Sequence, residues 1–249
     1  MAEMKPLRIL YHHRTQGRGA EGLHIVHIVR ALESLGHEVD ILSPPGIDPL
    51  ADIGAPPVDK ASVDTQGMQS VWKWVSRHLP NWLFELAEII YNIPAARRLE
   101  SALKKKKYDL VYERYAFFLV AGAIKAGKYN IPFVLEANEV SGIENRARRQ
   151  SFPRVCAFFE RMLLKRTTAV MTVSSTLRDM LTRQGAPEDT VYVVPNAIDM
   201  DKIHVSQDIS QLRNRHGLGS STVVGFAGWF DEWDRLDMLV SLVGKLRKK

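Results

Sequence analysis

The stretch TAVMTVSSTLRDMLTRQGAPEDTVYVVP, residues 168–195, decides the fold class. It begins with a short apolar run at 168–174, which predicts a buried strand. A helical pattern follows at 175–184, and Gly185 supplies the residue after the helix end that tolerates left-handed geometry. A second apolar run at 191–195 predicts another strand. This strand–helix–strand order is typical of a parallel sheet, because two parallel strands need a long crossover connection.

The same alternation extends toward the N-terminus. Short apolar runs predict four more strands, at residues 7–13, 37–43, 109–114 and 132–137. The segments between them predict helices, at residues 20–35, 66–107, 115–128 and 145–166. The expected fold class is α/β, a mostly parallel sheet with helices on both faces. Ligands of such sheets bind where the carboxyl ends of strands turn into helices, which here are the loops after His13, Arg114, Glu136, Ser174 and Pro195.

The C-terminal part of the chain predicts a separate and incomplete unit. We expect one domain over residues 1–204, a linker over 205–221, and the first βα unit of a second domain over 222–249. That unit consists of a predicted strand at 222–228 and a predicted helix at 235–248. A lone βα unit cannot bury its own apolar face, so its apolar residues should be exposed, docked or covered by another chain.

Composition and charge restrict the class of protein. The 249 residues are 45% hydrophobic and 25% charged, which suits a globular protein that buries a core. The formal net charge of +6 can attract phosphates or anionic lipid where it clusters. Cys156 is the single cysteine, which fits a reducing compartment, and we expect it to be a buried apolar residue. The N-terminus has no apolar signal-peptide run and no segment approaches ~18 apolar residues, so the sequence predicts a cytoplasmic protein.

Residues 16–23, QGRGAEGL, satisfy the letter of the G-x-G-x-x-G pattern through Gly17, Gly19 and Gly22. A dinucleotide site also needs its first glycine directly at the end of strand one and an acidic residue at the end of strand two. Neither condition is met, since three residues separate the predicted strand from Gly17 and Asp40 lies inside the second strand. A looser phosphate loop is favoured, in which backbone N–H groups and a helix start face an anion beside Arg18. A tight turn without a ligand is the alternative.

Several ordered motifs accompany this loop. They are ALESLGHEVDILSP (31–44), YDLVYERYAFF (108–118), IPFVLEANE (131–139), VSSTLRDMLTRQGAPEDTVYVVPNAIDMDKI (173–203) and TVVGFAGWFDEWDRLDML (222–239). In this order they resemble the family-4 glycosyltransferases of the two-domain GT-B type, from Leu7 to about Leu246. The resemblance implies a Rossmann-like N-terminal domain and the start of a C-terminal one. It also implies retaining transfer of a sugar from a nucleotide sugar to a glycan or lipid-linked acceptor, in polysaccharide or glycolipid synthesis, with no cofactor and no obligatory metal.

The resemblance also implies roles for individual residues. Gly17, Arg18 and Gly19 would form the loop that serves the donor diphosphate. Arg114 stands where many members have a histidine and could hold an acceptor or a phosphate, although the high pKa of an arginine makes it a poor general base. Independently of the resemblance, Glu136 and Asn138 end a buried strand at the carboxyl edge, where a carboxylate could position an acceptor hydroxyl; the alternative is a hydrogen bond to a neighbouring loop. Arg114, Glu136 and Asn138 are thus expected on the acceptor side, and Arg114 and Glu136 are the candidate catalytic residues. Asn196 and Asp199 would form the hinge between the domains.

The donor side departs from the family's pattern. The family's Glu-x7-Glu pair would fall beyond Lys249, and Arg235 is the remaining cation after the first strand of the second domain. We therefore expect a hexosyltransferase-type enzyme that is inactive as this chain alone. The alternative is a non-catalytic subunit that binds acceptor or membrane and needs a partner chain to supply the donor half.

The segment 68–107 combines tryptophans with basic residues. Such a combination favours a membrane interface, so the protein could be peripheral at the inner face of the membrane. The alternative is that the aromatic residues pack on the domain and the lysines form a solvated helix end. No nucleic-acid motif accompanies the charge, and His24 and His27 lack a third ligand in the sequence pattern, so neither nucleic acid nor metal is expected.

Overall fold

The computed structural model describes residues 5–51, 80–142, 150–197, 208–226 and 235–246. The chain divides into two units, with the boundary on the main chain between Pro195 and Asn196.

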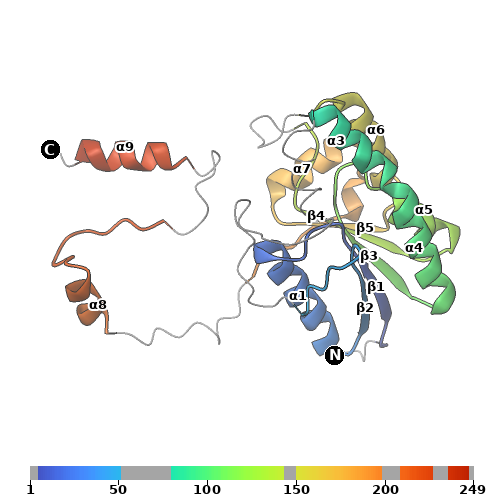
Figure 1. Ribbon diagram of the computed structural model, residues 1–249, viewed down its shortest axis with the longest axis horizontal. Coiled ribbons are helices and arrows are strands. Elements are labelled where there is room, and N and C mark those ends of the chain that lie inside the picture. Colours follow the sequence, from blue (N-terminus) through green and yellow to red (C-terminus); the bar gives the residue numbers. More distant parts are fainter. Residues whose placement is uncertain (1–4, 52–79, 143–149, 198–207, 227–234, 247–249) are drawn as a thin grey trace. The chain divides into compact units, whose positions relative to one another are not determined.

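The first unit contains a six-stranded parallel sheet (Figure 1). Its strands are β1 (Arg8–His12), β2 (Glu38–Leu42), β3 (Leu110–Arg114), β4 (Phe133–Ala137), β5 (Ala169–Thr172) and β6 (Val191–Val193). The order across the sheet is β2-β1-β3-β4-β5-β6, and every neighbouring pair is parallel. The predicted α/β class and all six predicted strands of this unit are confirmed, although each strand is shorter than its apolar run.

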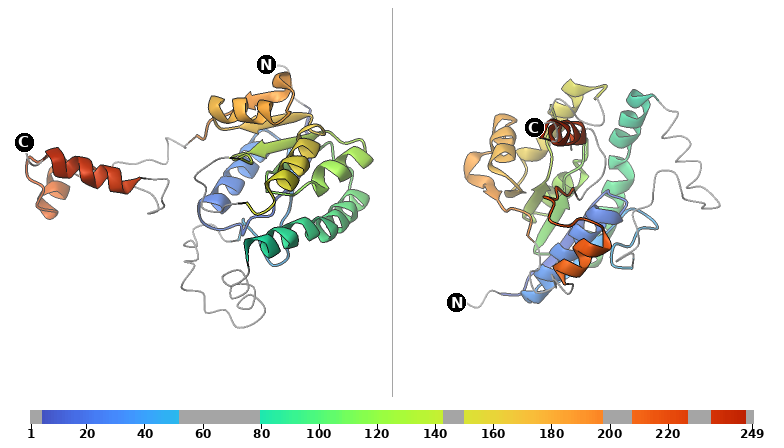
Figure 2. Two further views of the ribbon diagram at one scale, coloured as in Figure 1. Left: turned by 90° about the horizontal axis from the view of Figure 1, so that it is seen from above. Right: turned by 90° about the vertical axis from the view of Figure 1, so that its left-hand side faces the viewer.

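Apolar clusters lie on both faces of the sheet, because successive residues of a strand point to opposite sides. Leu10 belongs to the large cluster that includes Leu99 and Leu135, whereas Tyr11 packs with Ile25 and Val29. The first cluster is covered by α4 (Asn92–Lys105), α5 (Ala121–Lys128), α6 (Pro153–Leu164) and α7 (Ser175–Arg183), and the second by α1 (Gly19–Ser34) (Figure 2). Cys156 is 1% exposed in the core, as predicted.

Helix α5 begins six residues later than predicted. Residues 115–120 are not helical, and Phe118 has a positive φ of 62°. The start of the helix is capped by Asn92, whose side-chain oxygen accepts hydrogen bonds from the backbone N–H of Val120 (2.9 Å) and Ala121 (3.1 Å). The capping group therefore comes from α4 and not from the residues before the helix.

Helix α6 also begins later than predicted. Pro153 occupies its first turn, where the missing N–H costs nothing. Glu85, from α3 (Asn81–Ile90), is fully buried and accepts hydrogen bonds from the backbone N–H of Ser151 (2.7 Å) and Phe152 (2.8 Å). The predicted helical residues 66–79 and 145–149 lie outside the described residues.

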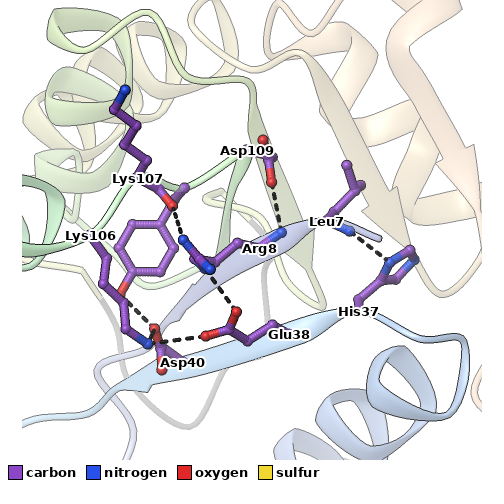
Figure 3. A network of polar contacts seen from close by, with 9 residues as sticks. Leu7, Arg8, His37, Glu38, Asp40, Lys106, Lys107 and Asp109 are labelled. Atoms are coloured by element: carbon purple, nitrogen blue, oxygen red, sulfur yellow. Dashed lines mark hydrogen bonds and ion pairs between the residues drawn. The ribbon is translucent and has the colours of Figure 1, made fainter. Parts of the chain in front are cut away.

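A polar network joins the amino ends of β1, β2 and β3, at the edge of the sheet opposite the predicted ligand loops (Figure 3). Arg8 pairs with Glu38 (2.8 Å), and Lys106 pairs with both Glu38 (3.1 Å) and Asp40 (2.7 Å). Asp109 accepts a hydrogen bond from the backbone N–H of Arg8 (2.8 Å). The Asp40 carboxylate is therefore engaged in the ion-pair network at the amino edge of the sheet. This agrees with the exclusion of Asp40 as the acid that binds the ribose in a dinucleotide site.

The second unit contains α8 (Ile209–Arg215) and α9 (Leu236–Leu246). The predicted strand at 222–228 is wrong over its described part, because residues 222–226 form no strand pairing. Strand geometry needs a neighbouring strand to satisfy its backbone, and the described residues of this unit supply none. Val223, Val224 and Leu242 are each at least half exposed, as expected for an apolar face without a sheet.

Candidate functional site

A pocket of about 600 Å³ lies at the carboxyl edge of the sheet. The chain runs from β1 to β2 on one side and to β3 on the other, so this edge contains the topological switch point where ligands of open α/β sheets bind. The pocket is lined by Arg14, Thr15, Gln16, Arg18, Glu21, Phe84, Glu88, Arg114, Tyr115, Ala116, Phe117, Asn138 and Glu139. The predicted residues Arg18, Arg114 and Asn138 are thus brought together.

Glu136 lies beneath this pocket and does not line it. The carboxylate is 4% exposed and accepts hydrogen bonds from Tyr11 Oη (3.0 Å), Asn138 Nδ2 (2.7 Å) and the guanidinium of Arg114. His24 Nε2 lies 2.9 Å from Glu136 Oε1. Four elements of the sequence therefore converge on one buried carboxylate.

The pKa of Glu136 is lowered. Burial alone would raise it, but the hydrogen bond with His24 and the charge of Arg114 outweigh burial. Burial and the Glu136 charge raise the pKa of Tyr11, which stays a neutral donor. An ionised, fully engaged carboxylate below the pocket is suited to holding Arg114 and Asn138 in place. We therefore regard Glu136 as a positioning residue, not as a base that reaches the substrate.

A second ion pair lies on the opposite wall of the pocket. Arg14 Nη2 is 2.8 Å from Glu88 Oε1, and the Arg14 guanidinium lies 5.9 Å from the ring centre of Tyr91. Sequence reasoning missed Phe84 and Glu88, because α3 falls in the segment that was read as packing or membrane-binding. The ion pair between Arg14 and Glu88 joins residues 74 positions apart, and a single sequence contains no pattern that predicts such a contact.

Two buried polar atoms of pocket residues have no hydrogen-bond partner among the described residues. One is the acceptor Asn138 Oδ1 and the other is the donor Arg14 Nη1. Buried polar atoms are almost always paired with protein groups or with water, so this acceptor and this donor keep hydrogen-bonding capacity for water or for a polar ligand.

The histidines at the end of β1 are both buried. His12 Nδ1 pairs with Glu113, and both side chains are 1% exposed. His13 is held between Ser43 and Thr15, with Nε2 2.8 Å from Ser43 Oγ. Burial, together with the charges of His12 and Arg114, lowers the pKa of His13 to about 4, so His13 is neutral at physiological pH.

The glycine loop is tightly packed. Gly17 and Gly19 have positive φ angles of 65° and 60°, and a side chain at Gly17 would collide with Ile47. Gly22 packs against the carbonyl of Gly17. Arg18 is the N-cap residue of α1 and lines the pocket, so the start of this helix lies at the pocket. The diphosphate role of this loop stays a prediction.

The predicted hinge and donor-side residues lie outside the pocket lining. Asn196 is exposed and begins the second unit, whereas Asp199 lies outside the described residues. Arg235 forms a two-pronged ion pair with Asp237, with both nitrogen–oxygen distances 3.0 Å. Its guanidinium is therefore already engaged within its own segment.

Among the described residues, no group of three or more His, Cys, Asp or Glu residues is arranged to hold a metal ion. No helix in the described part of the chain is long and apolar enough to cross a membrane.

The parallel sheet and the pocket at its carboxyl edge define a Rossmann-like α/β protein with a ligand site at the switch point. Glycosyltransferase Family 4 matches residues 22–202, which is more than half of the chain. The chain therefore belongs to Glycosyltransferase Family 4. No curated protein matches this sequence.

Solved structures show the same fold at low sequence identity. Anabaena HepE in complex with UDP is 16% identical, with a TM-score of 0.59, and the match covers 96% of this chain and 58% of HepE. The sucrose-phosphate synthase of Thermosynechococcus elongatus is 12% identical, with a TM-score of 0.54, over 85% of this chain and 53% of the synthase. This chain thus spans less than two thirds of the length of these proteins.

Proposed function

We propose that this chain binds the acceptor in a glycosyltransferase that moves a sugar from a nucleotide sugar to a glycan or lipid-linked acceptor. The family match supports glycosyl transfer in general. Retention of configuration, a hexose donor and a role in polysaccharide or glycolipid synthesis follow from the resemblance and are parts of the proposal.

The assignment of the pocket to the acceptor substrate rests on its two unpaired polar atoms, one hydrogen-bond donor and one hydrogen-bond acceptor. The hydroxyl groups of a sugar both donate and accept, so they can pair with Asn138 Oδ1 and with Arg14 Nη1 once these buried side chains turn toward the ligand. A purely anionic ligand cannot donate to Asn138 Oδ1, and a purely cationic ligand cannot accept from Arg14 Nη1. The cations Arg14 and Arg114 are already paired with Glu88 and Glu136. Because these two guanidinium groups are already paired, the part of the pocket that they line is better suited to a neutral, hydroxyl-rich ligand than to a diphosphate.

The donor diphosphate is proposed to lie at the start of α1, beside Arg18. As the glycosidic bond breaks, the departing diphosphate gains negative charge, which helix N-terminal N–H groups and arginine stabilise. HepE was solved with UDP-glucose, so UDP-glucose is the first donor to try. Because Gly19 has a positive φ, a valine there would strain the backbone as well as block a phosphate, so Arg18→Ala is the better test of the loop.

The test is a transfer assay with the full chain, alone and with a second chain that supplies a donor-binding domain. UDP-glucose and other nucleotide sugars are offered with glycan and lipid-linked acceptors, and NMR of the product gives the anomeric configuration. Asn138→Ala should raise the acceptor KM or Kd about tenfold, the effect of losing one hydrogen bond of about 1.4 kcal/mol. Asn214→Ala, on exposed α8, is the matched control and should change nothing.

The outcomes separate the proposal from its alternative. An inverted product would contradict retention. Acceptor binding that depends on Asn138, without transfer under any of these conditions, would favour the non-catalytic subunit. Equal acceptor affinity of the parent and the Asn138 variant would refute the pocket assignment.

A further inference from the structure

The helix pair α3–α4 carries an apolar stripe on its outer face. Trp82, Leu86, Ile90 and Ile93 are 49%, 40%, 53% and 55% exposed. They are four, four and three residues apart, which places them on one side of a helix. Tyr91, between the two helices, is itself in the helical region, so α4 continues the line of α3 (Figures 1 and 2). The stripe therefore extends over about three turns.

The polar residues of the same segment point inward. Glu85 is fully buried and receives the N–H groups that start α6, and Glu88 pairs with Arg14. Asn92 donates to the carbonyl of Phe118 (2.8 Å) and caps α5. This is the reverse of an ordinary surface helix, which turns its charged residues to water. Both acidic side chains of α3 are removed from the outer face, and large apolar side chains take their place.

Basic residues continue the stripe toward the end of α4. Arg97 follows Ile93 by one turn, and Lys104 and Lys105 are exposed in the last turn. Lys104 lies 3.4 Å from Glu100, a residue of the same helix that also pairs with Lys125 and Lys128, so the cations of this region outnumber its one carboxylate. Lys106 is engaged by Glu38 and Asp40 at the sheet edge. The outer face of α3 and α4 thus combines an apolar part with a cationic part.

We propose that this outer face, defined by Trp82, Leu86, Ile90, Ile93, Arg97, Lys104 and Lys105, binds the surface of an anionic lipid membrane. A lipid surface fits both parts at once, since the acyl boundary accepts the apolar side chains and the headgroups attract the cations. Tryptophan favours the headgroup level, and the net charge of +6 adds a general attraction. The helix pair lies in the plane of the interface and does not cross it. The proposal is independent of the transfer reaction.

The test measures binding of the full chain to phosphatidylcholine vesicles with and without phosphatidylglycerol, by flotation. The parent should bind the anionic vesicles, and added salt should weaken binding. The Leu86→Gln/Ile90→Gln variant should bind at least about tenfold more weakly. The Arg97→Gln/Lys104→Gln/Lys105→Gln variant should lose about fivefold per cation, on anionic vesicles alone.

Ile124→Gln is the matched control, because Ile124 is a 44% exposed isoleucine on α5. It should bind like the parent, and all variants should keep the parent melting temperature, since only exposed side chains change. The proposal would be overturned if phosphatidylglycerol did not increase vesicle binding by the parent. It would also be overturned if the stripe variants bound the vesicles as strongly as the parent. Loss of an oligomer in the Leu86→Gln/Ile90→Gln variant without any vesicle binding by the parent would overturn it as well, and would make the face a protein interface.

Discussion

Replacing Glu136 by glutamine should destabilise the protein strongly. The glutamine can keep its oxygen on Arg114 and Asn138, which both donate to Oε1, and its amide group then faces the hydroxyl of Tyr11 at the Oε2 position. The 13%-exposed guanidinium of Arg114 loses its counter-charge. Breaking a buried ion pair by removing one partner costs about 3–5 kcal/mol. Since domains unfold with only about 5–15 kcal/mol, this is a large share of the total stability.

Urea unfolding followed by circular dichroism measures the effect, with the midpoint falling and the slope unchanged. Glu33→Gln is the control, because Glu33 is an exposed residue of α1, and it should change stability by less than about 0.5 kcal/mol.

The pH dependence of the stability gives a second measurement. The pKa of Glu136 is lowered in the folded state, so its contribution is present above the ordinary carboxyl pKa and is lost as pH falls through the folded pKa. Glu136→Gln should lack this acid-induced loss. A change below about 1 kcal/mol would refute the anchoring role.

Three further predictions concern other buried groups. His13→Gln should reduce the rise in stability between about pH 4 and pH 6.5, because the lowered pKa of His13 makes the unfolded chain bind the extra proton there; urea midpoints across this range measure it. Asn92→Leu should cost roughly 2–4 kcal/mol, because the N–H groups of Val120 and Ala121 lose their acceptor, and a retained parent midpoint would contradict the capping role. Burial raises the pKa of Cys156 to about 12, so a thiol reagent should react only after denaturant is added; rapid reaction of the folded chain would show that the site opens.

The strands were predictable because their signal is local. A short apolar run bounded by polar residues is enough to place β3 or β4 within one or two residues, since the core on both faces of a parallel sheet selects apolar side chains at most positions. The starts of α5 and α6 were not predictable. They depend on Asn92 and Glu85, which lie 28 and 66 residues from the groups that they bind.

The candidate site also combines features that the sequence predicts with features that depend on distant residues. The sequence placed Arg114, Glu136 and Asn138 at one edge of the sheet, because parallel strands end together. It did not reveal that Glu136 lies below the pocket and binds Tyr11 and His24. The contact with Tyr11 depends on the direction of side chains on β1, and the contact with His24 depends on how α1 packs against the sheet. The roles of neighbouring residues at one sheet edge are decided by side-chain direction, which a single sequence does not encode.

Helix α3 has consequences for how the two proposed sites influence one another. Its inner side contributes Phe84 and Glu88 to the pocket wall, and its outer side carries Trp82 and Leu86. One helix diameter of about 10 Å therefore separates the proposed sugar-binding wall from the proposed lipid-facing side. A membrane that fixes α3 in the position that suits the acceptor would raise acceptor affinity by some factor. Thermodynamic reciprocity then requires that bound acceptor tighten membrane attachment by the same factor. Under both proposals, molecules of this chain that hold an acceptor would therefore stay longest on the bilayer.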